Sequence, residues 1–319
     1  MGDAVDTDPG AHGALRAGSD SRCVACGGRE LVPHLAVAGT LDERGLIPTT
    51  DRYGTALADI VRCRLCGHMQ LERFPDEVEL KQAYARAESE DYLAEERGQR
   101  ETARVVLDSI ERHVRRGNLV DLGCWLGYLV SEAEARGWNA VGVEPSEFAS
   151  QHARERLGLD VRTTDLLGAE LPEGECQAVV LGDVIEHLPG ADRALDRVAA
   201  LLGPGGVVAM ALPDAGSRVA RVMGSRWWSV IPTHVHYFTR HSIRALLERR
   251  GYRVLSIETS PKTFTVRYYL GRIGGYSPRL GRALVAAAAR AGVADRMWAP
   301  DFRDRMLVIA RHEPGPTPT

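Results

Sequence analysis

Lysine is almost missing from this chain of 319 residues, because Lys81 and Lys262 are the only lysines among 40 basic residues. Arginine supplies the remaining positive charge, and both side chains carry the same charge at pH 7, so this bias says nothing about binding partners. The formal net charge is −3. No basic surface is therefore expected, and nothing in the charge balance predicts binding to nucleic acid.

Long apolar runs and a signal peptide are missing as well. No stretch reaches the roughly 18 apolar residues that a spanning helix needs, since even RALVAAAARAGVA is interrupted by Arg290. Residues 1–20 are acidic and rich in small residues, without the basic and apolar regions of a signal peptide, and we expect them to be disordered. The composition, 44% hydrophobic and 26% charged, is typical of a soluble globular protein, which we expect in the cytoplasm. Its length predicts about two domains, or one domain with an appendage.

Cysteine is scarce, but four of the six cysteines form two pairs with two residues between the partners. The pairs are Cys23 with Cys26 and Cys63 with Cys66, and each is followed by a glycine that suits a tight turn. This spacing predicts a zinc site with four thiolate ligands in a zinc-ribbon-like module over residues 21–75. The 36 residues between the pairs exceed the usual separation of roughly 15 to 20. A redox pair or a metal-free module therefore stays an alternative.

A zinc ion with four cysteine ligands has no open position, and catalytic zinc usually has histidine or carboxylate ligands. The expected zinc is therefore structural. His34 and His68 lie near the pairs and could replace one thiolate, although a solvated loop position is the simpler interpretation of both.

Residues 76–116 are charged and repeat apolar residues at helical spacing, for example Val106, Ile110 and Val114. We expect a helical connector here, made of two helices that end at Gly117.

A strand, a glycine loop and a helix follow in NLVDLGCWLGYLV, which predicts a ligand site at the end of a strand. The next strand ends in Glu144, where a carboxylate can accept hydrogen bonds from both hydroxyls of a ribose. Dinucleotide sites and S-adenosylmethionine (SAM) sites share this pattern. The loop has the form DxGxxxG, and Asp121 would repel a pyrophosphate but attract a cationic ligand. A further strand ends in Asp165, which could accept a hydrogen bond from an adenine amino group.

The order of several motifs resembles the class I SAM-dependent methyltransferases. The motifs are VDLGCWLG, VGVEPS, TTDL, VVLGDVIEHL, LLGPGGVVAMALPD and LLERRGYRVLSIE, over about residues 117–260, with DRMLVIAR as the last strand. The resemblance implies an α/β fold with a Rossmann-like sheet of seven strands in a methyltransferase domain over residues 117–311. A helical insertion at about 262–300 and a tail at 312–319 complete the expected organisation.

The resemblance also implies which residues bind SAM. They are Asp121, Gly123 and Gly127 at the methionine end, Glu144 at the ribose, Asp165 at the adenine, and Asp183 near the methyl-donor pocket. One departure is Trp125, which stands where the family commonly has a glycine, and which must point away from the cofactor or form a wall beside it. Asp183 or Glu186 could instead cap the next helix, and His187 is expected to pack rather than to catalyse.

Three histidines lie close together in IPTHVHYFTRH, in a part of the chain where this fold places substrate-facing loops. His234 and His236 alternate, so an extended segment would turn both to one side, where they could share a metal ion. No acidic residue is close in sequence to complete such a site, and we do not favour a metal here. His241 or Ser242 is expected to be the N-cap of the helix that follows.

The cysteine pairs together with the later HxxYF are similar to the zinc-containing deoxysugar C-methyltransferases and their shorter relatives. This resemblance implies that His234 is the catalytic base, and a neutral imidazole with a pKa of ~6.5 can take a proton at neutral pH. Thr233 stands where those enzymes commonly have an acid, and we do not expect their large C-terminal domain here. We therefore expect O-methylation of a small molecule, at a hydroxyl of a sugar, a glycan or glycolipid, or a natural product.

Three alternatives stay open. They are C-methylation of a deoxysugar, methylation of RNA held by the zinc module, and a non-catalytic interaction protein for which Trp125 is the one argument. The net charge and the lack of a basic, aromatic strip on the module disfavour RNA. The insertion at about 262–300 could be a lid over the acceptor or a packing surface in a homodimer. The identity of the methyl acceptor is not determined by the sequence.

Overall fold

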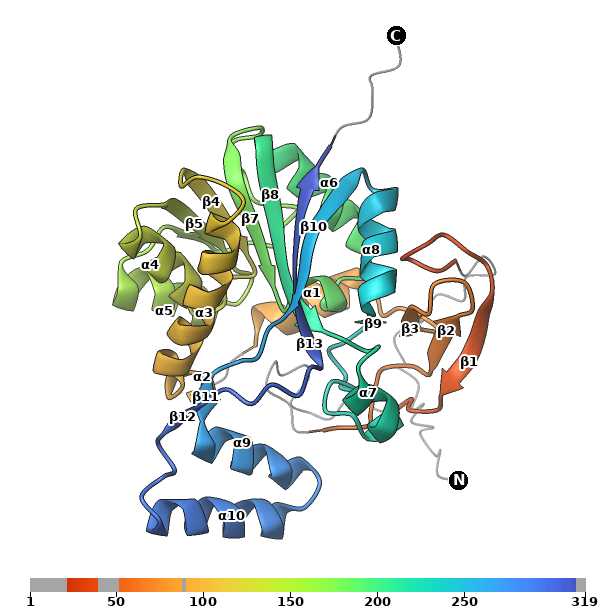
Figure 1. The fold of residues 1–319 in the computed structure, drawn as a ribbon, viewed down its shortest axis with the longest axis vertical. Coiled ribbons are helices and arrows are strands. Elements are labelled where there is room, and N and C mark those ends of the chain that lie inside the picture. Colours follow the sequence, from red (N-terminus) through yellow and green to blue (C-terminus); the bar gives the residue numbers. More distant parts are fainter. Residues whose placement is uncertain (1–21, 40–51, 88–89, 314–319) are drawn as a thin grey trace, which may run out of the picture.

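A sheet of seven strands forms the centre of the computed structural model, which describes residues 22–39, 52–87 and 90–313 (Figure 1). Its strands are β4 (Asn118–Leu122), β5 (Asn139–Val143), β6 (Val161–Arg162), β7 (Cys176–Gly182), β8 (Leu202–Pro213), β10 (Tyr252–Thr259) and β13 (Arg305–His312). Their order is β10-β13-β8-β7-β4-β5-β6, and only β13 runs antiparallel to its neighbours. The predicted α/β fold with a Rossmann-like sheet of seven strands is confirmed. Residues 1–20 and most of the tail at 312–319 lie outside the described residues.

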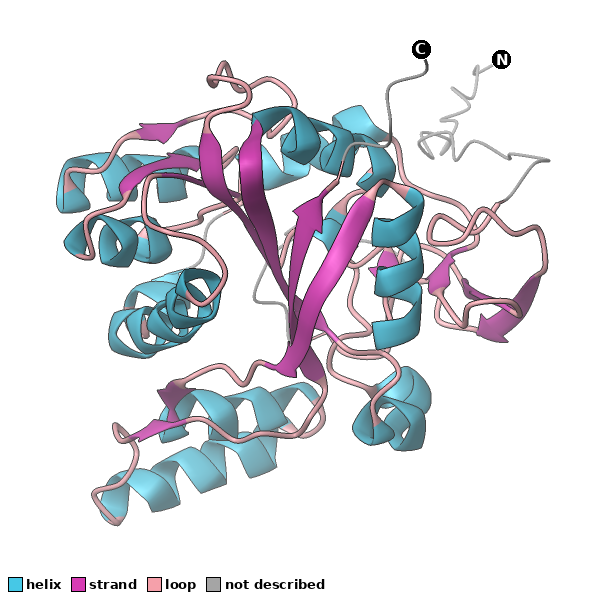
Figure 2. Ribbon diagram, turned by 45° about the horizontal axis from the view of Figure 1, so that its top comes forward, coloured by secondary structure: helices cyan, strands magenta, loops and turns pink. Residues whose placement is uncertain are grey.

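Helices cover both faces of this sheet (Figure 2). One face carries α3 (Glu96–Glu111), α4 (Tyr128–Ala135) and α5 (Glu147–Leu157), and the other carries α6 (Ala191–Leu201) and α8 (Arg240–Arg249). Leu107 of α3 and Leu195 of α6 are fully buried, each in the core on its own face. Burying a side chain of this size contributes about 1.5–3 kcal/mol, so the helical spacing of apolar residues fixes which side of each helix meets the sheet.

In its described residues, the stretch before the sheet contains three helices rather than the expected two. They are α1 (Glu77–Ala85), α2 (Glu90–Leu93) and α3. The last of them ends at Glu111, before the expected end at Gly117. The N–H groups of His113 and Val114 both bond to the carbonyl of Ile110, and this tightened turn stops the helix.

The N-cap of α8 is Thr239, so the expectation of His241 or Ser242 is wrong. The Thr239 hydroxyl accepts a hydrogen bond from the N–H of Ser242, and the Ser242 hydroxyl accepts one from the N–H of Thr239. This capping box needs its two members three residues apart, which places the start of the helix before His241.

A second, antiparallel sheet joins the cysteine pairs to the histidine stretch. Its strands are β1 (Leu31–Leu35), β2 (Ile60–Cys63), β3 (Met69–Leu71) and β9 (His236–Tyr237), in that order. Met69 pairs with Tyr237 and Gln70 pairs with His236. The cysteine module therefore completes its sheet with a strand from the distant histidine stretch.

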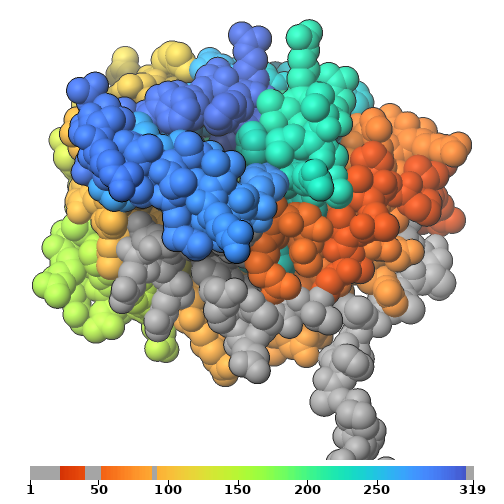
Figure 3. Space-filling model, turned by 90° about the horizontal axis from the view of Figure 1, so that it is seen from below, coloured from red at the N-terminus to blue at the C-terminus, as the bar shows by residue number. Residues whose placement is uncertain are grey.

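Two helices and a short hairpin lie between β10 and β13. The elements are β11 (Phe264–Thr265), α9 (Val266–Arg272), η3 (Ile273–Gly275), α10 (Pro278–Arg290) and β12 (Met297–Trp298). They share one face of the molecule with the cysteine module and with α7 (Arg218–Met223) and η2 (Gly224–Arg226) (Figure 3). Tyr276 joins the three parts, because its ring lies 4.9 Å from that of Tyr53 and its hydroxyl donates to the carbonyl of Arg226. Among the described residues, no helix is long and apolar enough to cross a membrane.

Candidate active site

A cavity of about 750 Å³ lies at the carboxyl ends of the parallel strands. Open α/β sheets bind their ligands at this edge, and the volume is within the usual range of about 300–1,000 Å³ for ligand pockets. Two groups of residues form its polar lining. The strand-end wall is Asp121, Gly123, Trp125, Glu144 and Asp165, and the histidine wall is Asp183, His187, His234, Lys262 and Arg305.

Glu144 is held by the loop that follows β4. One carboxylate oxygen accepts a hydrogen bond from the backbone N–H of Trp125 at 2.9 Å, and the other accepts one from Ser146 at 2.8 Å. Each oxygen keeps a free lone pair for a ligand hydroxyl. Burial raises the pKa of Glu144 to about 7 against these two hydrogen bonds. Burial, with Glu144 nearby, likewise raises the pKa of Asp121 to about 7.

The two glycines of the loop have different roles. Gly123 lines the cavity at a φ of +82°, and a Cβ there would lie 2.5 Å from the side chain of Val184. Gly127, expected at the methionine end together with Gly123, is not among the residues that line the cavity. It caps α4 at a φ of +80°, where a Cβ would collide with Leu159 and Ala153. Both positions need glycine, but only Gly123 presents bare backbone to a ligand.

Trp125 forms part of the cavity wall, which is one of the two orientations left open by the sequence. Its φ is +47°, in the left-handed region that glycine adopts without strain. The ring meets that of Tyr92 edge to face at 6.4 Å. Trp125 therefore keeps the backbone conformation that a glycine would adopt here and adds an aromatic surface to the cavity.

Asp165 and Asp183 both form salt bridges with basic side chains in the cavity. Asp165 pairs with Lys81 at 3.0 Å, and Asp183 pairs with Lys262 and with Arg305, both at 2.5 Å. Although burial acts in the opposite direction, Arg305 and Lys262 hold the pKa of Asp183 below its ordinary value.

Neither of the two acids proposed as helix caps serves as one. The N-cap of α6 is Gly190, so Asp183 and Glu186 do not take that role. Glu186 instead lies in η1 (Ile185–His187) and is buried.

Both lysines of the chain line this cavity, which the sequence analysis missed. The scarcity of lysine is the one feature of the sequence that could indicate a role for Lys81 and Lys262. Arg305 and Tyr84 are also lining residues that no motif indicated.

His234 is buried at the end of a turn, in which its N–H bonds to the carbonyl of Ile231. Its Nδ1 lies 2.8 Å from the carbonyl oxygen of Ser229. Because a carbonyl only accepts, Nδ1 carries the proton and Nε2 keeps a lone pair. Burial lowers the pKa of His234 well below 6.5, so the ring is neutral at pH 7.

His187 faces His234, with ring centroids 4.7 Å apart. Its Nδ1 lies 2.8 Å from the carbonyl oxygen of Thr233 and 2.6 Å from the hydroxyl of Tyr84. Burial lowers the pKa of His187 to about 4. His187 is thus a half-buried residue of the cavity wall, where packing or capping was expected.

His236 has different neighbours from His234. It does not line the cavity, and its ring nitrogens contact the carbonyl of Leu188 at 3.1 Å and the ring of His68 at 3.3 Å. The turn that ends at His234 interrupts the alternation, so the two histidines do not face one metal ion. His68 is fully buried against this ring, contrary to the expected solvated loop position.

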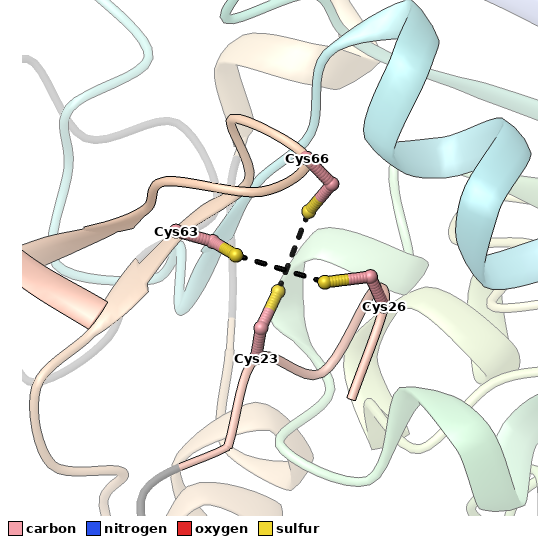
Figure 4. Close-up of side chains that lie close together, drawn as sticks. All are labelled: Cys23, Cys26, Cys63 and Cys66. Atoms are coloured by element: carbon pink, nitrogen blue, oxygen red, sulfur yellow. Dashed lines mark hydrogen bonds between the residues drawn. The ribbon is translucent and has the colours of Figure 1, made fainter. Parts of the chain in front are cut away.

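The four paired cysteines converge at one point (Figure 4). The Sγ atoms of Cys23 and Cys66 are 3.5 Å apart, and those of Cys26 and Cys63 are 3.6 Å apart. All four Sγ atoms lie within 4.8 Å of one another. Tetrahedral zinc with Zn–S bonds of about 2.3 Å needs sulfur atoms about 3.8 Å apart, so the arrangement fits this ion. His34 and His68 are not members of the cluster.

Comparison with known proteins identifies the class of enzyme. Residues 94–257, about half of the chain, match the methyltransferase domain family, and the chain belongs to this family. A probable SAM-dependent methyltransferase from Mycolicibacterium smegmatis is 26% identical over 65% of this chain and 76% of its own length. A ubiquinone biosynthesis O-methyltransferase from Agrobacterium fabrum is 38% identical, but over only 28% of this chain and 38% of its own. The crystal structure of a SAM-dependent methyltransferase from Archaeoglobus fulgidus covers 70% of this chain and 99% of its own, with 17% identity and a TM-score of 0.48.

The chain is therefore a SAM-dependent methyltransferase, and its acceptor is a small molecule.

Proposed function

We propose that this enzyme transfers the methyl group of SAM to a hydroxyl of a sugar, a glycan or glycolipid, or a natural product. The observation that carries the proposal is the position of His234. This buried, neutral imidazole faces His187 on the wall of a cavity whose other wall is formed by the strand ends.

The strand-end wall suits the cofactor. Glu144 has a free lone pair on each oxygen for the two ribose hydroxyls, and Asp121 offers negative charge to the ammonium group. Gly123 allows close approach of the backbone at the methionine end, and Gly127 acts by starting α4 behind it. Asp165 lies at the adenine, where Lys81 fixes its carboxylate. Bound SAM supplies an electrophilic methyl group to the cavity.

His234 acts on the acceptor hydroxyl, either by taking its proton or by orienting its oxygen. Ser229 holds Nδ1, so the ring is fixed with the Nε2 lone pair available. The burial that keeps the ring neutral also makes the imidazolium costly, which weakens it as a base. Thr233 gives no help, because its hydroxyl is buried without a partner among the described residues and is not acidic.

The cavity suits an acceptor with a flat or ring-shaped apolar face. Its aromatic lining residues include Tyr53, Trp228, Tyr268, Tyr276, Trp298 and Phe302. Aromatic rings provide large apolar contact surfaces with little loss of side-chain freedom. The similarity to a ubiquinone biosynthesis O-methyltransferase supports an oxygen acceptor, whereas the cysteine pairs, shared with deoxysugar C-methyltransferases, leave a carbon acceptor as the second candidate.

We also propose that the four cysteines hold one structural zinc ion. Neighbouring Cys66 lowers the pKa of the Cys23 thiol to about 5, and the thiolate is the form that binds metal. Zinc would fix the module that supplies Tyr53 to the cavity.

A screen of hydroxylated acceptors with isotope-labelled SAM tests the function, and NMR of the product identifies the new bond. We expect an O-methyl signal. A new C-methyl signal would replace the proposed acceptor atom, and a folded protein that does not bind SAM at micromolar concentration would contradict the proposal as a whole.

A further inference from the structure

Three potential metal ligands meet at the histidine wall: His187 and His234, which belong to it, and Glu186, which is not among the residues that line the cavity. One ligand atom of each lies within 4.8 Å of the others. Glu186 is only 1% exposed, and neither of its carboxylate oxygens has a hydrogen-bond partner among the described residues. Leaving a carboxylate buried without a partner is costly, and buried polar groups in native proteins are almost always satisfied. Burial raises the pKa of Glu186 to about 8, so a cation that binds here releases a proton from this unpartnered carboxyl group.

The two histidines are oriented as metal ligands usually are. The Nδ1 atoms of His187 and His234 each lie 2.8 Å from a backbone carbonyl oxygen, that of Thr233 and that of Ser229 respectively. Such a hydrogen bond fixes the ring and leaves the lone pair on Nε2. The Tyr84 hydroxyl, 2.6 Å from His187 Nδ1, can accept from the same N–H and donate to the Thr233 carbonyl. With this arrangement neither ring has to change its tautomer to bind a cation.

Backbone hydrogen bonds hold the cluster together. Glu186 and His187 follow β7, and the N–H of Val235 donates to the carbonyl of Glu186 at 2.9 Å. The carbonyl of Val235 in turn accepts from Leu71 of the cysteine module at 3.0 Å. The position of His234 beside Glu186 is thus set by main-chain contacts on both sides.

Neighbouring positive charges would oppose a cation, but the nearby ones are already paired. Lys262 and Arg305 both bond to Asp183, each at 2.5 Å, and Asp183 lies outside the three-residue cluster. The carboxylate of Glu186 is left for the ion.

We infer that Glu186, His187 and His234 bind one divalent cation, to which the acceptor hydroxyl is a further ligand. Two imidazoles and one carboxylate leave coordination positions open. His187 and His234 line the cavity, so an open position is accessible to the acceptor. The inference rests on the proposed function, because that function places the acceptor hydroxyl beside His234. It decides between the two roles of that residue: His234 orients the oxygen through the ion.

Coordination lowers the pKa of a bound hydroxyl, as it does for metal-bound water. The hydroxyl proton passes to water in the open cavity. The oxygen then forms the new bond to the methyl carbon while the carbon–sulfur bond of SAM breaks, and S-adenosylhomocysteine leaves. The ion thereby compensates for the weak basicity of a buried imidazole.

Cobalt(II), added to the full chain that retains its zinc, tests the site by absorption spectroscopy and equilibrium dialysis. We expect one cobalt ion per chain, with weak visible bands and without the intense bands of thiolate ligands. Glu186→Gln and His187→Gln should weaken cobalt binding at least about 10-fold, the usual effect of losing a metal-site contact. His241→Gln, an exposed histidine, is the matched control and should bind as the wild type does. Unchanged SAM affinity in each variant shows that it is folded.

Equal cobalt affinity in the wild type and in Glu186→Gln would overturn the inference, and so would binding that shows only thiolate bands. Once an acceptor is known, chelation of the second ion should reduce methyl transfer at least 10-fold and cobalt should restore it; unchanged transfer would also overturn it. The cobalt measurement needs neither acceptor nor turnover. A chain that binds cobalt here but methylates no hydroxyl would refute the proposed function instead.

Discussion

The two walls of the cavity are assembled in different ways. The strand-end wall uses residues at or just after the ends of β4, β5 and β6, and most of its contacts lie within short strand–loop units, as with Glu144 and the N–H of Ser146. The pair of Asp165 with Lys81 is its long-range exception. The histidine wall joins the end of β7, the turn before β9, the loop after β10 and the start of β13. A site made of local units tolerates changes elsewhere in the chain, whereas one made of distant segments depends on the whole fold.

The walls also differ in charge. Asp121 and Glu144 are carboxyl groups whose pKa burial raises to about 7. The histidine wall holds neutral imidazoles and two cations that share Asp183. If one wall serves the cofactor and the other the acceptor, a change in one should leave the function of the other nearly intact. Three experiments test this separation.

The largest effect is expected from His234→Ala. Removing the imidazole should lower kcat by about 10²-fold, the usual cost of misplacing a reacting atom, because the acceptor oxygen loses the residue that orients it. SAM affinity, measured by calorimetry, should change by less than about 3-fold, because His234 is not on the strand-end wall. His241→Ala is the control. A parallel loss of SAM affinity would show that the histidine is structural and that the walls are not separate.

A smaller effect, confined to SAM binding, is expected from Glu144. Below pH 7 Asp121 and Glu144 hold protons, which must leave before the carboxylates can accept hydrogen bonds or attract the ammonium. SAM affinity should therefore rise with pH up to about 7 and then level off, by up to about 10-fold per unit for each proton released. Calorimetric titration from pH 5.5 to 8.5 measures this.

Glu144→Gln should weaken SAM binding by about 10- to 100-fold at pH 8, because hydrogen bonds to a charged group contribute about 1.5–3 kcal/mol. It should also flatten the pH dependence. Glu147→Gln, at an exposed neighbour, is the control. An affinity that does not change with pH would mean that neither carboxyl group contacts the cofactor.

The smallest effect on catalysis is expected from Cys63→Ser. Zinc content, measured by mass spectrometry, should fall from one ion per chain toward zero, and Tm should decrease. The KM for the acceptor should rise about 2- to 10-fold, which corresponds to losing one aromatic contact of about 0.5–1.5 kcal/mol, that of Tyr53. SAM affinity should be unchanged. Cys176→Ala, a buried cysteine outside the cluster, is the control, and equal zinc content in both variants would refute the metal site.

The strand-end wall could be predicted because its signals are local. A strand, a glycine with positive φ and an acid at the next strand end lie within short motifs, and the structure brings Asp121, Gly123, Glu144 and Asp165 to one cavity. Gly127 shows the limit of this reasoning. A glycine at this place in the motif could either line the cavity or cap the helix behind it. The tertiary packing of Gly127 against Leu159 and Ala153 shows that it caps the helix.

The histidine wall could be predicted only in part. The resemblance places Asp183 and His234 at the site, and both line the cavity. The sequence offers no motif that indicates His187, Lys262 or Arg305 as lining residues. These residues contact partners far away in the sequence, as Lys262 contacts Asp183, and no motif spacing predicts such contacts. The N-cap of α8 was predicted wrongly for a smaller reason. The candidate Ser242 is part of the capping box, but as the third residue of the helix, and Thr239 is the cap.

The sequence by itself determined the two cysteine pairs and the ordered motifs whose resemblance to a known family implies the seven-stranded fold, because thiolate spacing and strand-and-turn motifs act over a few residues. Only the tertiary structure decided what the histidines face. The pairing of β9 with β3, and the bond from Val235 to Glu186, turn His234 toward His187 and the cavity and leave His236 against His68. Those contacts form between segments far apart in the chain, and their geometry exists only once both sheets have folded.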